Sequence, residues 1–455
     1  MSNFLPQNLS ITGVSLFLWA FFSPLVDLPK INIMGFSSRP GYLLLIPFFL
    51  ILLIKFKNFF KIINKNKKIS IIIGAIIIYN FSNLFFQNEI KNRTFGMLIW
   101  LSINLIILLW TVENRDKIVN LYNGYLYGQL FNALYLIYTV LFYPNVFLLK
   151  PMEPYFFDGM IRGFGFSGEP SYFSVSVLPL ICFLFLQDLN KKNITFLGIL
   201  ILAAFLSFSR LSMLGILIMP VFFLLAKGKM KKSFGVYLCI TLLSLVSAYA
   251  INPGYFSKVN YTKSKRAEID KNRVGYPQKL RKLELYTGLK MIDRGWNSQR
   301  IMSFKRSFLL FTEKPLFGVG IGNSHQALRE RFLHTSAEHY YVEGCSNLFI
   351  EILLEQGLIG SLLLLTLCFL LIKALFLSFT LPITLAPFLF LILFVMQFAQ
   401  TLTIPTILVF TAIMFLKTDQ RISFKNSGQK LKNYQNFLIS IFINKPLPKS
   451  QKYNF

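Results

Sequence analysis

Apolar runs about as long as a lipid bilayer is thick recur from one end of this 455-residue chain to the other. Soluble domains lack such runs and carry about a quarter charged residues, whereas this chain carries 15%. A transmembrane β-barrel would instead alternate apolar and polar residues in segments of about ten. The pattern therefore predicts an all-α polytopic membrane protein with about twelve transmembrane helices. The runs lie at about Ile11–Val26, Gly41–Phe56, Ile69–Phe86, Phe95–Val112, Leu121–Tyr143, Ser171–Gln187, Ile194–Ser209, Leu211–Ala226, Phe234–Ile251, Leu348–Ile372, Pro382–Phe398 and Ile404–Leu416.

Lysine and arginine clusters between the apolar runs predict which loops lie in the cytoplasm. The clusters at 55–68, 191–192 and 227–232, and the tail from Lys417, all fall on one side if the helices are threaded with both termini in the cytoplasm. The formal net charge of +28 then follows from topology and does not indicate a nucleic acid partner.

This threading divides the chain into five parts and places a long loop on the outer face between helices nine and ten. In that loop bases outnumber acids by roughly two to one, which an anionic ligand or nearby lipid headgroups would explain. The parts are N-terminal transmembrane helices at 1–143, central transmembrane helices with an outer-loop motif at 144–251, the large basic outer loop at 252–345, C-terminal transmembrane helices at 346–416 and a basic cytoplasmic tail at 417–455.

Four polar clusters stand at the expected outer ends of the helices. They are Arg162-Gly-Phe-Gly-Phe-Ser-Gly-Glu169-Pro-Ser171, Ser207-Phe-Ser-Arg210-Leu-Ser212, Arg300-Ile-Met-Ser-Phe-Lys-Arg306 followed by Lys314-Pro-Leu-Phe-Gly-Val-Gly-Ile-Gly-Asn323, and Ser346-Asn347-Leu-Phe-Ile-Glu351-Ile-Leu-Leu-Glu355-Gln-Gly-Leu-Ile-Gly360.

Each cluster also has a purely structural explanation, which for the third is an amphipathic helix that ends in a glycine-rich turn. Ser167 or Glu169 could cap the following helix, and Arg210 could extend its charge to the membrane surface. Glu351 and Glu355 share one helical face, where burial costs free energy unless a cavity or partner receives the carboxylates.

The sequence offers no metal or nucleotide motif. It contains neither an Asp-x-Asp pair nor a Walker A sequence, and its histidines, His325, His334 and His339, are not spaced as ligands on one helical turn. We therefore predict neither a metal nor a cofactor.

Taken in order, the four clusters resemble those of the bacterial O-antigen polymerase and ligase superfamily, and most closely those of Wzy-type polysaccharide polymerases. The resemblance extends from about Arg162 to Gly360. It implies a GT-C-like, metal-independent, inverting glycosyltransferase in the bacterial inner membrane, with its active site on the periplasmic face. The implied substrate is an undecaprenyl-diphosphate-linked oligosaccharide, and a chain-length regulator and a flippase are possible partners.

The resemblance also implies roles for particular residues. Arg162, Arg210 and Arg300 are expected to bind the donor diphosphate, because guanidinium groups bind phosphates bidentately and keep their charge. Glu169 or His339 is expected to accept the proton of the attacking sugar hydroxyl. The residues expected to make further substrate contacts are Arg306, His325, Asn347 and Glu351.

One departure separates the branches of the superfamily. Ligases usually carry a histidine just before the asparagine of the fourth motif, where this chain has Cys345-Ser346-Asn347. This departure favours a polymerase of O-antigen or of capsular polysaccharide over a ligase that transfers the glycan to a lipid A core. The ligase stays open because His339 could substitute if the loop folds back. A polysaccharide flippase is a further alternative, although it would place charges deep within the helices.

Overall fold

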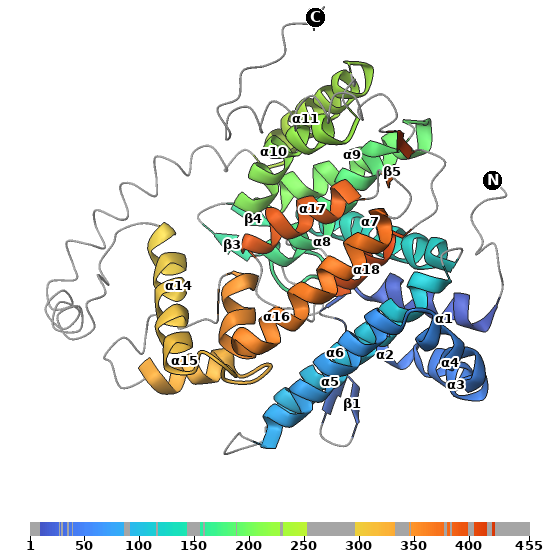
Figure 1. The fold of residues 1–455 in the computed structure, drawn as a ribbon. Helices are drawn as coiled ribbons and strands as arrows, with labels where there is room; N and C mark the ends of the chain where they lie inside the picture. The colour runs from blue at the N-terminus through green and yellow to red at the C-terminus, as the bar shows by residue number, and fades with distance from the viewer. Residues whose placement is uncertain are drawn as a thin grey trace, which may run out of the picture.

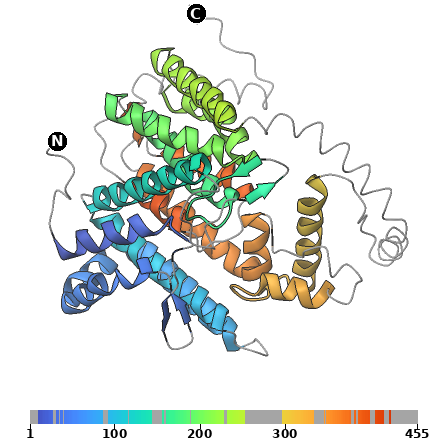
Figure 2. The same ribbon diagram turned by 180° about the vertical axis from the view of Figure 1, so that it is seen from behind.

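The computed structural model is mostly helical and is drawn as a ribbon in Figures 1 and 2. The residues it describes are 10–26, 28, 31–33, 36–38, 40–85, 92–114, 117–142, 155–157, 160–187, 189–227, 231–252, 296–332, 345, 347–376, 380–382, 385–398, 405–415 and 421–423.

The helices follow the order of the apolar runs. They are α1 (Ile11–Phe22), α2 (Pro40–Leu43), α3 (Ile46–Ile54), α4 (Phe56–Lys65), α5 (Lys67–Phe85), α6 (Asn92–Glu113), α7 (Ile118–Phe142), α8 (Pro170–Leu186), α9 (Lys191–Leu206), α10 (Arg210–Lys227), α11 (Lys231–Ile251), α14 (Trp296–Glu313), α15 (Ser324–Phe332), α16 (Leu348–Phe376), α17 (Leu385–Leu393), the 3₁₀ helix η3 (Val395–Phe398) and α18 (Pro405–Ile413).

The strands that the structure describes form short antiparallel hairpins. They are β1 (Ile31–Ile33) with β2 (Phe36–Ser38), β3 (Tyr155–Phe157) with β4 (Met160–Arg162), and β5 (Thr380–Pro382) with β6 (Arg421–Ser423). The last pair joins the segment after α16 to the segment after α18.

Several helices are long and apolar enough to cross a membrane. Five qualify on their own, and α2–α3 with α4 forms a sixth candidate that is bent by 85°. The five are Lys67–Leu84, Thr94–Glu113, Ile118–Phe142, Phe234–Ile251 and Leu348–Ala374, and shorter apolar helices lie at Ile11–Phe22, Pro170–Leu186 and Arg210–Val221. The prediction of an all-α, multi-pass membrane protein is thus confirmed, while the count of twelve spans stays a prediction.

Helix α8 is the centre of the packing. Every residue from Phe173 to Leu186 is buried, and α8 contacts α9, α10 and α17. A helix that is apolar on all sides is expected to be buried on all sides, and this one is surrounded by other helices. The loop residues that precede Pro170 are therefore attached to the most enclosed helix in the described part of the chain.

Helices α1 and α7 approach each other closely through two glycines. A Cβ atom at Gly124 would clash with the carbonyl oxygen of Phe17, and one at Gly128 would clash with that of Phe21. Glycines four residues apart are a common means of bringing two membrane helices into close contact. The first apolar run of the chain therefore packs against the fifth.

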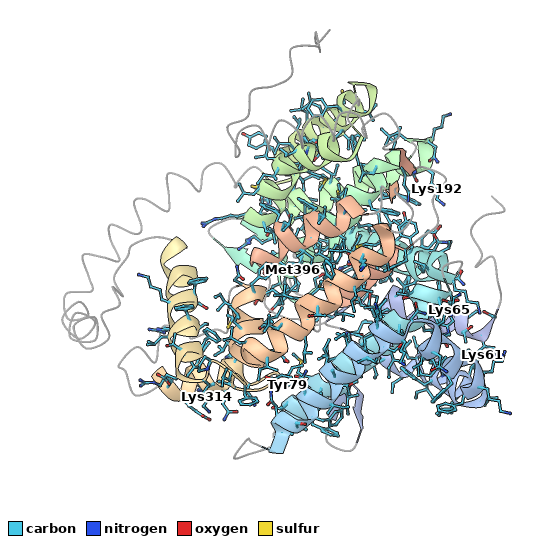
Figure 3. All side chains as sticks on the ribbon, in the orientation of Figure 1. Lys61, Lys65, Tyr79, Lys192, Lys314 and Met396 are labelled. Carbon is cyan, nitrogen blue, oxygen red and sulfur yellow. The ribbon has the colours of Figure 1, made fainter. Side chains whose placement is uncertain are left out.

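Polar contacts join segments that the threading places on the same face. On the expected inner side, Lys65 forms an ion pair with Glu113, and the Lys117 ammonium donates to the Thr12 hydroxyl at 3.4 Å. On the expected outer side, the Thr94 hydroxyl donates to the side-chain oxygen Oδ1 of Asn323 at 2.5 Å. In Figure 3, Lys61, Lys65 and Lys192 lie toward one edge of the molecule, and Lys314 lies toward the opposite edge.

Helix α16 is interrupted at Gly357, whose φ of 61° and ψ of −169° are not helical. The glycine-rich segment after α14 covers the break: the amide of Val319 donates to the carbonyl of Leu354 at 2.8 Å, and the amide of Leu358 donates to the carbonyl of Pro315 at 2.8 Å. In a membrane protein, backbone groups freed by a break need partners within the protein. The break separates a short first part of α16, which carries Glu351 and Glu355, from the longer apolar part that follows.

We predict that Gly357→Ala destabilises the protein by at least about 2 kcal/mol, because only glycine adopts this backbone conformation without strain. The added Cβ would also clash with the carbonyl oxygen of Leu316. Thermal unfolding of the detergent-solubilised protein measures the effect. Gly198→Ala is the matched control, since a Cβ at this α9 position meets nothing within 4 Å. Equal unfolding temperatures for the two variants would contradict the prediction.

Candidate functional site

The first predicted motif folds onto the side of α7. After strand β4, the backbone amide of Phe166 donates to the side-chain oxygen Oδ1 of Asn132 at 2.7 Å. The side-chain amide nitrogen of Asn132 donates to the Ser167 hydroxyl at 2.8 Å. Gly165 has a φ of 57° and lies so close to Asn132 that a Cβ atom would clash with it. Since all these groups are buried, their hydrogen bonds fix the conformation of the loop between β4 and α8.

The second motif forms a tight turn beside the first. Phe208, between α9 and α10, has a φ of 45°, which is rare for a residue with a side chain. The Ser207 hydroxyl accepts a hydrogen bond from the amide of Ser209 at 3.3 Å and donates one to the carbonyl of Ala204 at 2.7 Å. Strained conformations of this kind persist where the surroundings fix them, and they concentrate at functional sites.

The two motifs are joined by hydrogen bonds to the backbone. The Arg162 guanidinium donates to the carbonyl of Phe208 at 3.3 Å, and the amide of Gly163 donates to the carbonyl of Leu206 at 3.3 Å. Arg210 is the first residue of α10, two residues after Phe208, and its side chain is exposed. The structure thus brings together the chain segments of two arginines that are 48 positions apart in the sequence.

Glu169 stands at the start of α8 with an exposed side chain. It occupies the N-cap position, yet its carboxylate makes no capping bond to the helix. One carboxylate oxygen instead accepts a hydrogen bond from the Ser171 hydroxyl at 3.0 Å. The capping explanation is therefore wrong for Glu169, and a solvent-facing carboxylate lies seven residues after Arg162. The Ser167 hydroxyl accepts its hydrogen bond from Asn132.

A second polar cluster lies where α14 and α15 meet the first part of α16. Arg306, Glu351 and Glu355 are all buried there. One carboxylate oxygen of Glu355 accepts a hydrogen bond from the amide of Ser324, the first residue of α15, at 3.3 Å. Buried charges are costly unless they are paired or hydrogen-bonded, and this bond joins α15 to α16, while α14 packs against both helices. Burial also lowers the pKa of the Arg306 guanidinium.

Cys345 belongs to the same cluster and stands two positions before Asn347 of the fourth motif. Its thiol is buried 3.1 Å from the Ser307 hydroxyl. Burial, together with the nearby carboxylates of Glu351 and Glu355, raises the pKa of the thiol well above its usual range. The thiol therefore stays protonated at neutral pH and is a poor base or nucleophile.

The other predicted site residues lie elsewhere. The Asn347 carbonyl oxygen caps α16 by accepting from the amide of Phe349 at 2.8 Å, and His325 is half-buried in α15. Arg300 lies in α14 with its side chain outside the described residues, and His334 and His339 lie outside them altogether. Within the described residues, no group of three or more His, Cys, Asp or Glu could hold a metal ion.

Asn132 is the residue of this site that the sequence analysis missed. The available signal was an amide side chain within the apolar run Leu121–Tyr143, because polar residues in membrane helices are costly and often functional. Its partners Phe166 and Ser167 are 34 and 35 positions further along the chain, so no local pattern could identify them.

Part of the chain matches a known protein family. Residues 195–365 match a family model described as O-antigen ligase. The matched segment includes Arg210, Arg300, the glycine-rich segment and the fourth motif, while Arg162 and Glu169 precede it. No curated protein matches the chain. The match supports the O-antigen polymerase and ligase superfamily, to which the motifs had shown a resemblance.

We predict that Asn132→Leu lowers the free energy of unfolding by about 2–4 kcal/mol, because it leaves a buried amide and a buried hydroxyl without their partner. Thermal unfolding in detergent measures the loss. Asn104→Leu is the control: Asn104 is also a buried asparagine, but its carbonyl oxygen has no hydrogen-bond partner in the described part of the chain. We expect the control to be neutral or stabilising, and a similar loss in both variants would contradict the role given to Asn132.

Proposed function

We propose that this membrane protein of the O-antigen polymerase and ligase superfamily is a polysaccharide polymerase. It would join undecaprenyl-diphosphate-linked oligosaccharide repeat units on the outer face of the bacterial inner membrane, without a metal. The observation that carries the proposal is the contact between the Arg162 loop and the turn that precedes Arg210. It brings together two segments that each carry an arginine, and the exposed carboxylate of Glu169 follows seven residues after Arg162.

The proposed reaction requires groups that stabilise negative charge and a group that accepts a proton. A hydroxyl of the acceptor glycan attacks the anomeric carbon of the donor, and the bond from that carbon to the diphosphate oxygen breaks. Negative charge develops on the departing polyprenyl diphosphate, and arginines stabilise it through bidentate hydrogen bonds. Arg162 and Arg210 would fill this role together with Arg300. The hydroxyl proton would pass to Glu169, whose exposed carboxylate is free of backbone capping.

The buried cluster of Arg306, Glu351 and Glu355 supports the assignment of the substrate contacts to the residues named above. Arg306 and Glu351 were both expected to contact substrate, but their burial where α14 and α15 meet α16 favours a structural role. The carboxylates of Glu351 and Glu355 lie on the first part of α16, before the break at Gly357. They would therefore brace the glycine-rich segment from within and leave the exposed Arg210 and Glu169 to face the substrate.

An O-antigen ligase, which would transfer the same glycan to a lipid A core, is the second candidate. The description of the matching family favours it. The fourth motif favours the polymerase, because the chain has Cys345 and Ser346 where the ligases carry a histidine and the Cys345 thiol stays protonated. A flippase is the third candidate. In that case the chemical structure of the polymer would not depend on this protein, but its export would.

A gel of surface polysaccharide from a strain with and without the gene separates these candidates. Loss of the ladder, with retention of core plus a single repeat unit, identifies the polymerase. Loss of all glycan from the core, with accumulation of lipid-linked polymer, identifies the ligase. An unchanged pattern would reject both enzymes.

We predict that Arg162→Lys and Arg210→Lys each reduce chain elongation at least about tenfold, since lysine keeps the charge but cannot make a bidentate bond to phosphate. Complementation of the deletion strain, followed by the same gel, measures elongation. Arg329→Lys, an exposed arginine of α15, is the control and should leave the ladder intact. Full-length polymer from either arginine variant at normal expression would reject the diphosphate role.

We predict that Glu169→Gln abolishes elongation, because glutamine keeps the shape of the side chain but cannot accept the proton of the attacking hydroxyl. The variant can still accept the hydrogen bond from Ser171, so insertion and stability should not change. In-vitro extension of a lipid-linked acceptor by the purified variant measures the effect. Normal extension would exclude Glu169 as the base and move attention to His339.

A further inference from the structure

We infer that helix α4 lies along the cytoplasmic surface of the membrane and binds acidic phospholipid headgroups through its lysines. This inference does not depend on the proposed enzymatic activity. It rests on the direction of α4, on the distribution of its side chains and on its attachment to α6.

The direction of α4 follows from the bend at Lys55. The segment Gly41–Ile54 is apolar and runs at 85° to Phe56–Lys65. If the first segment crosses the bilayer, the second lies nearly parallel to the membrane plane. Its ten residues span only about 15 Å and could not cross the hydrocarbon core.

The side chains of α4 form three faces. Phe59, Ile62 and Ile63 pack against the protein core. Phe56 and Phe60, four residues apart, are 52% and 49% exposed, and they lie next to Ile54, which is 81% exposed. Lys57, Lys61 and Lys65 are spaced four residues apart and are also exposed. A helix with an outward apolar pair beside a row of lysines is the pattern of an interfacial helix, with rings at the acyl boundary and ammonium groups among the headgroups.

The charge on this surface is of one sign. Residues 55–68 contain the lysines Lys55, Lys57, Lys61, Lys65, Lys67 and Lys68 and no acidic residue. Lys65 is neutralised by Glu113 of α6, which leaves the other lysines for an anionic partner. The membrane surface beside which α4 would lie offers phosphate groups at that depth, and cytoplasmic leaflets rich in acidic lipid attract such clusters.

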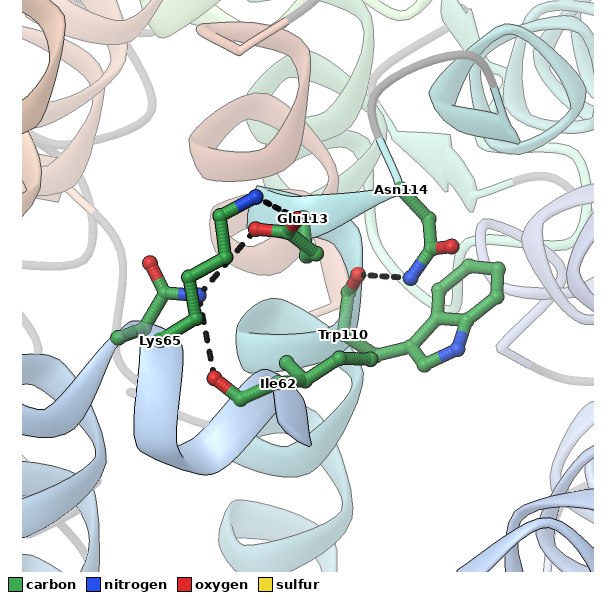
Figure 4. A network of polar contacts seen from close by, with 6 residues as sticks. Ile62, Lys65, Trp110, Glu113 and Asn114 are labelled. Atoms are coloured by element: carbon green, nitrogen blue, oxygen red, sulfur yellow. Dashed lines mark hydrogen bonds and ion pairs between the residues drawn. The ribbon is translucent and has the colours of Figure 1, made fainter. Parts of the chain in front are cut away.

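The end of α4 is fixed to the rest of the protein (Figure 4). Besides the Lys65–Glu113 ion pair, the Asn66 side-chain amide donates to the carbonyl of Ile62 at 3.2 Å and to the Glu113 carboxylate at 3.4 Å. The helix is thus held at a set angle, so its lysines face the headgroups without an ordering cost at the moment of binding.

Native mass spectrometry of the full-length protein with phosphatidylglycerol or phosphatidylcholine tests the inference. The wild type should bind its first phosphatidylglycerol more tightly than its first phosphatidylcholine. Lys57→Gln with Lys61→Gln should weaken the tightest phosphatidylglycerol binding at least about tenfold, since each lysine near an acidic surface contributes roughly fivefold. Neither lysine forms the ion pair with Glu113, so the fold should be kept, and circular dichroism checks this.

Two control variants make the result specific. Lys305→Gln with Lys314→Gln removes the same charge from exposed lysines at and just after α14, and it should leave the tight binding intact. Lys57→Arg with Lys61→Arg should also preserve it. Equal binding of the two lipids by the wild type would overturn the inference, as would an equal loss in the α14 control, which would reduce the effect to net charge.

Discussion

Backbone groups that lose their helical hydrogen bonds inside a membrane protein must find other partners within the protein, and this constraint shapes two polar regions of the molecule. At Gly357 the partners come from the glycine-rich segment after α14, through the amide of Val319 and the carbonyl of Pro315. Between α9 and α10 they come from the loop after β4, through the amide of Gly163 and the guanidinium of Arg162. In both places the partners belong to the four motifs of the sequence.

This constraint explains why glycine and arginine are grouped in the motifs. Glycine supplies the backbone conformations that such close pairing requires, as at Gly165 and Gly357. A guanidinium has five N–H donors, and one of those of Arg162 bonds to the carbonyl of Phe208. The same side chain can thus support the turn and contribute to the proposed diphosphate site. Elsewhere the buried carboxylate of Glu355 accepts a hydrogen bond from the amide of Ser324 and so joins α16 to α15.

Much of the architecture could be predicted from the sequence because hydrophobic run length and motif order are local properties. The helical membrane fold and the four motifs are examples. The interruptions could not be predicted in the same way. Gly357 lies within an apolar run that reads as one continuous helix, and Phe208 adopts a positive φ that its residue type disfavours. The role of Asn132 depends on partners more than thirty residues away, which only the folded chain brings into contact.

The close contact of α1 with α7 has a consequence for the order in which the protein is made. Helix α1 packs against Gly124 and Gly128 of α7, which are synthesised more than a hundred residues after Phe17 and Phe21. At about 5–20 residues per second, a ribosome needs roughly 5–20 seconds to cover that distance. During this interval α1 lies in the bilayer or beside the insertion machinery, and α7 has not yet been made. Helix α1 is therefore made well before the glycines against which it packs.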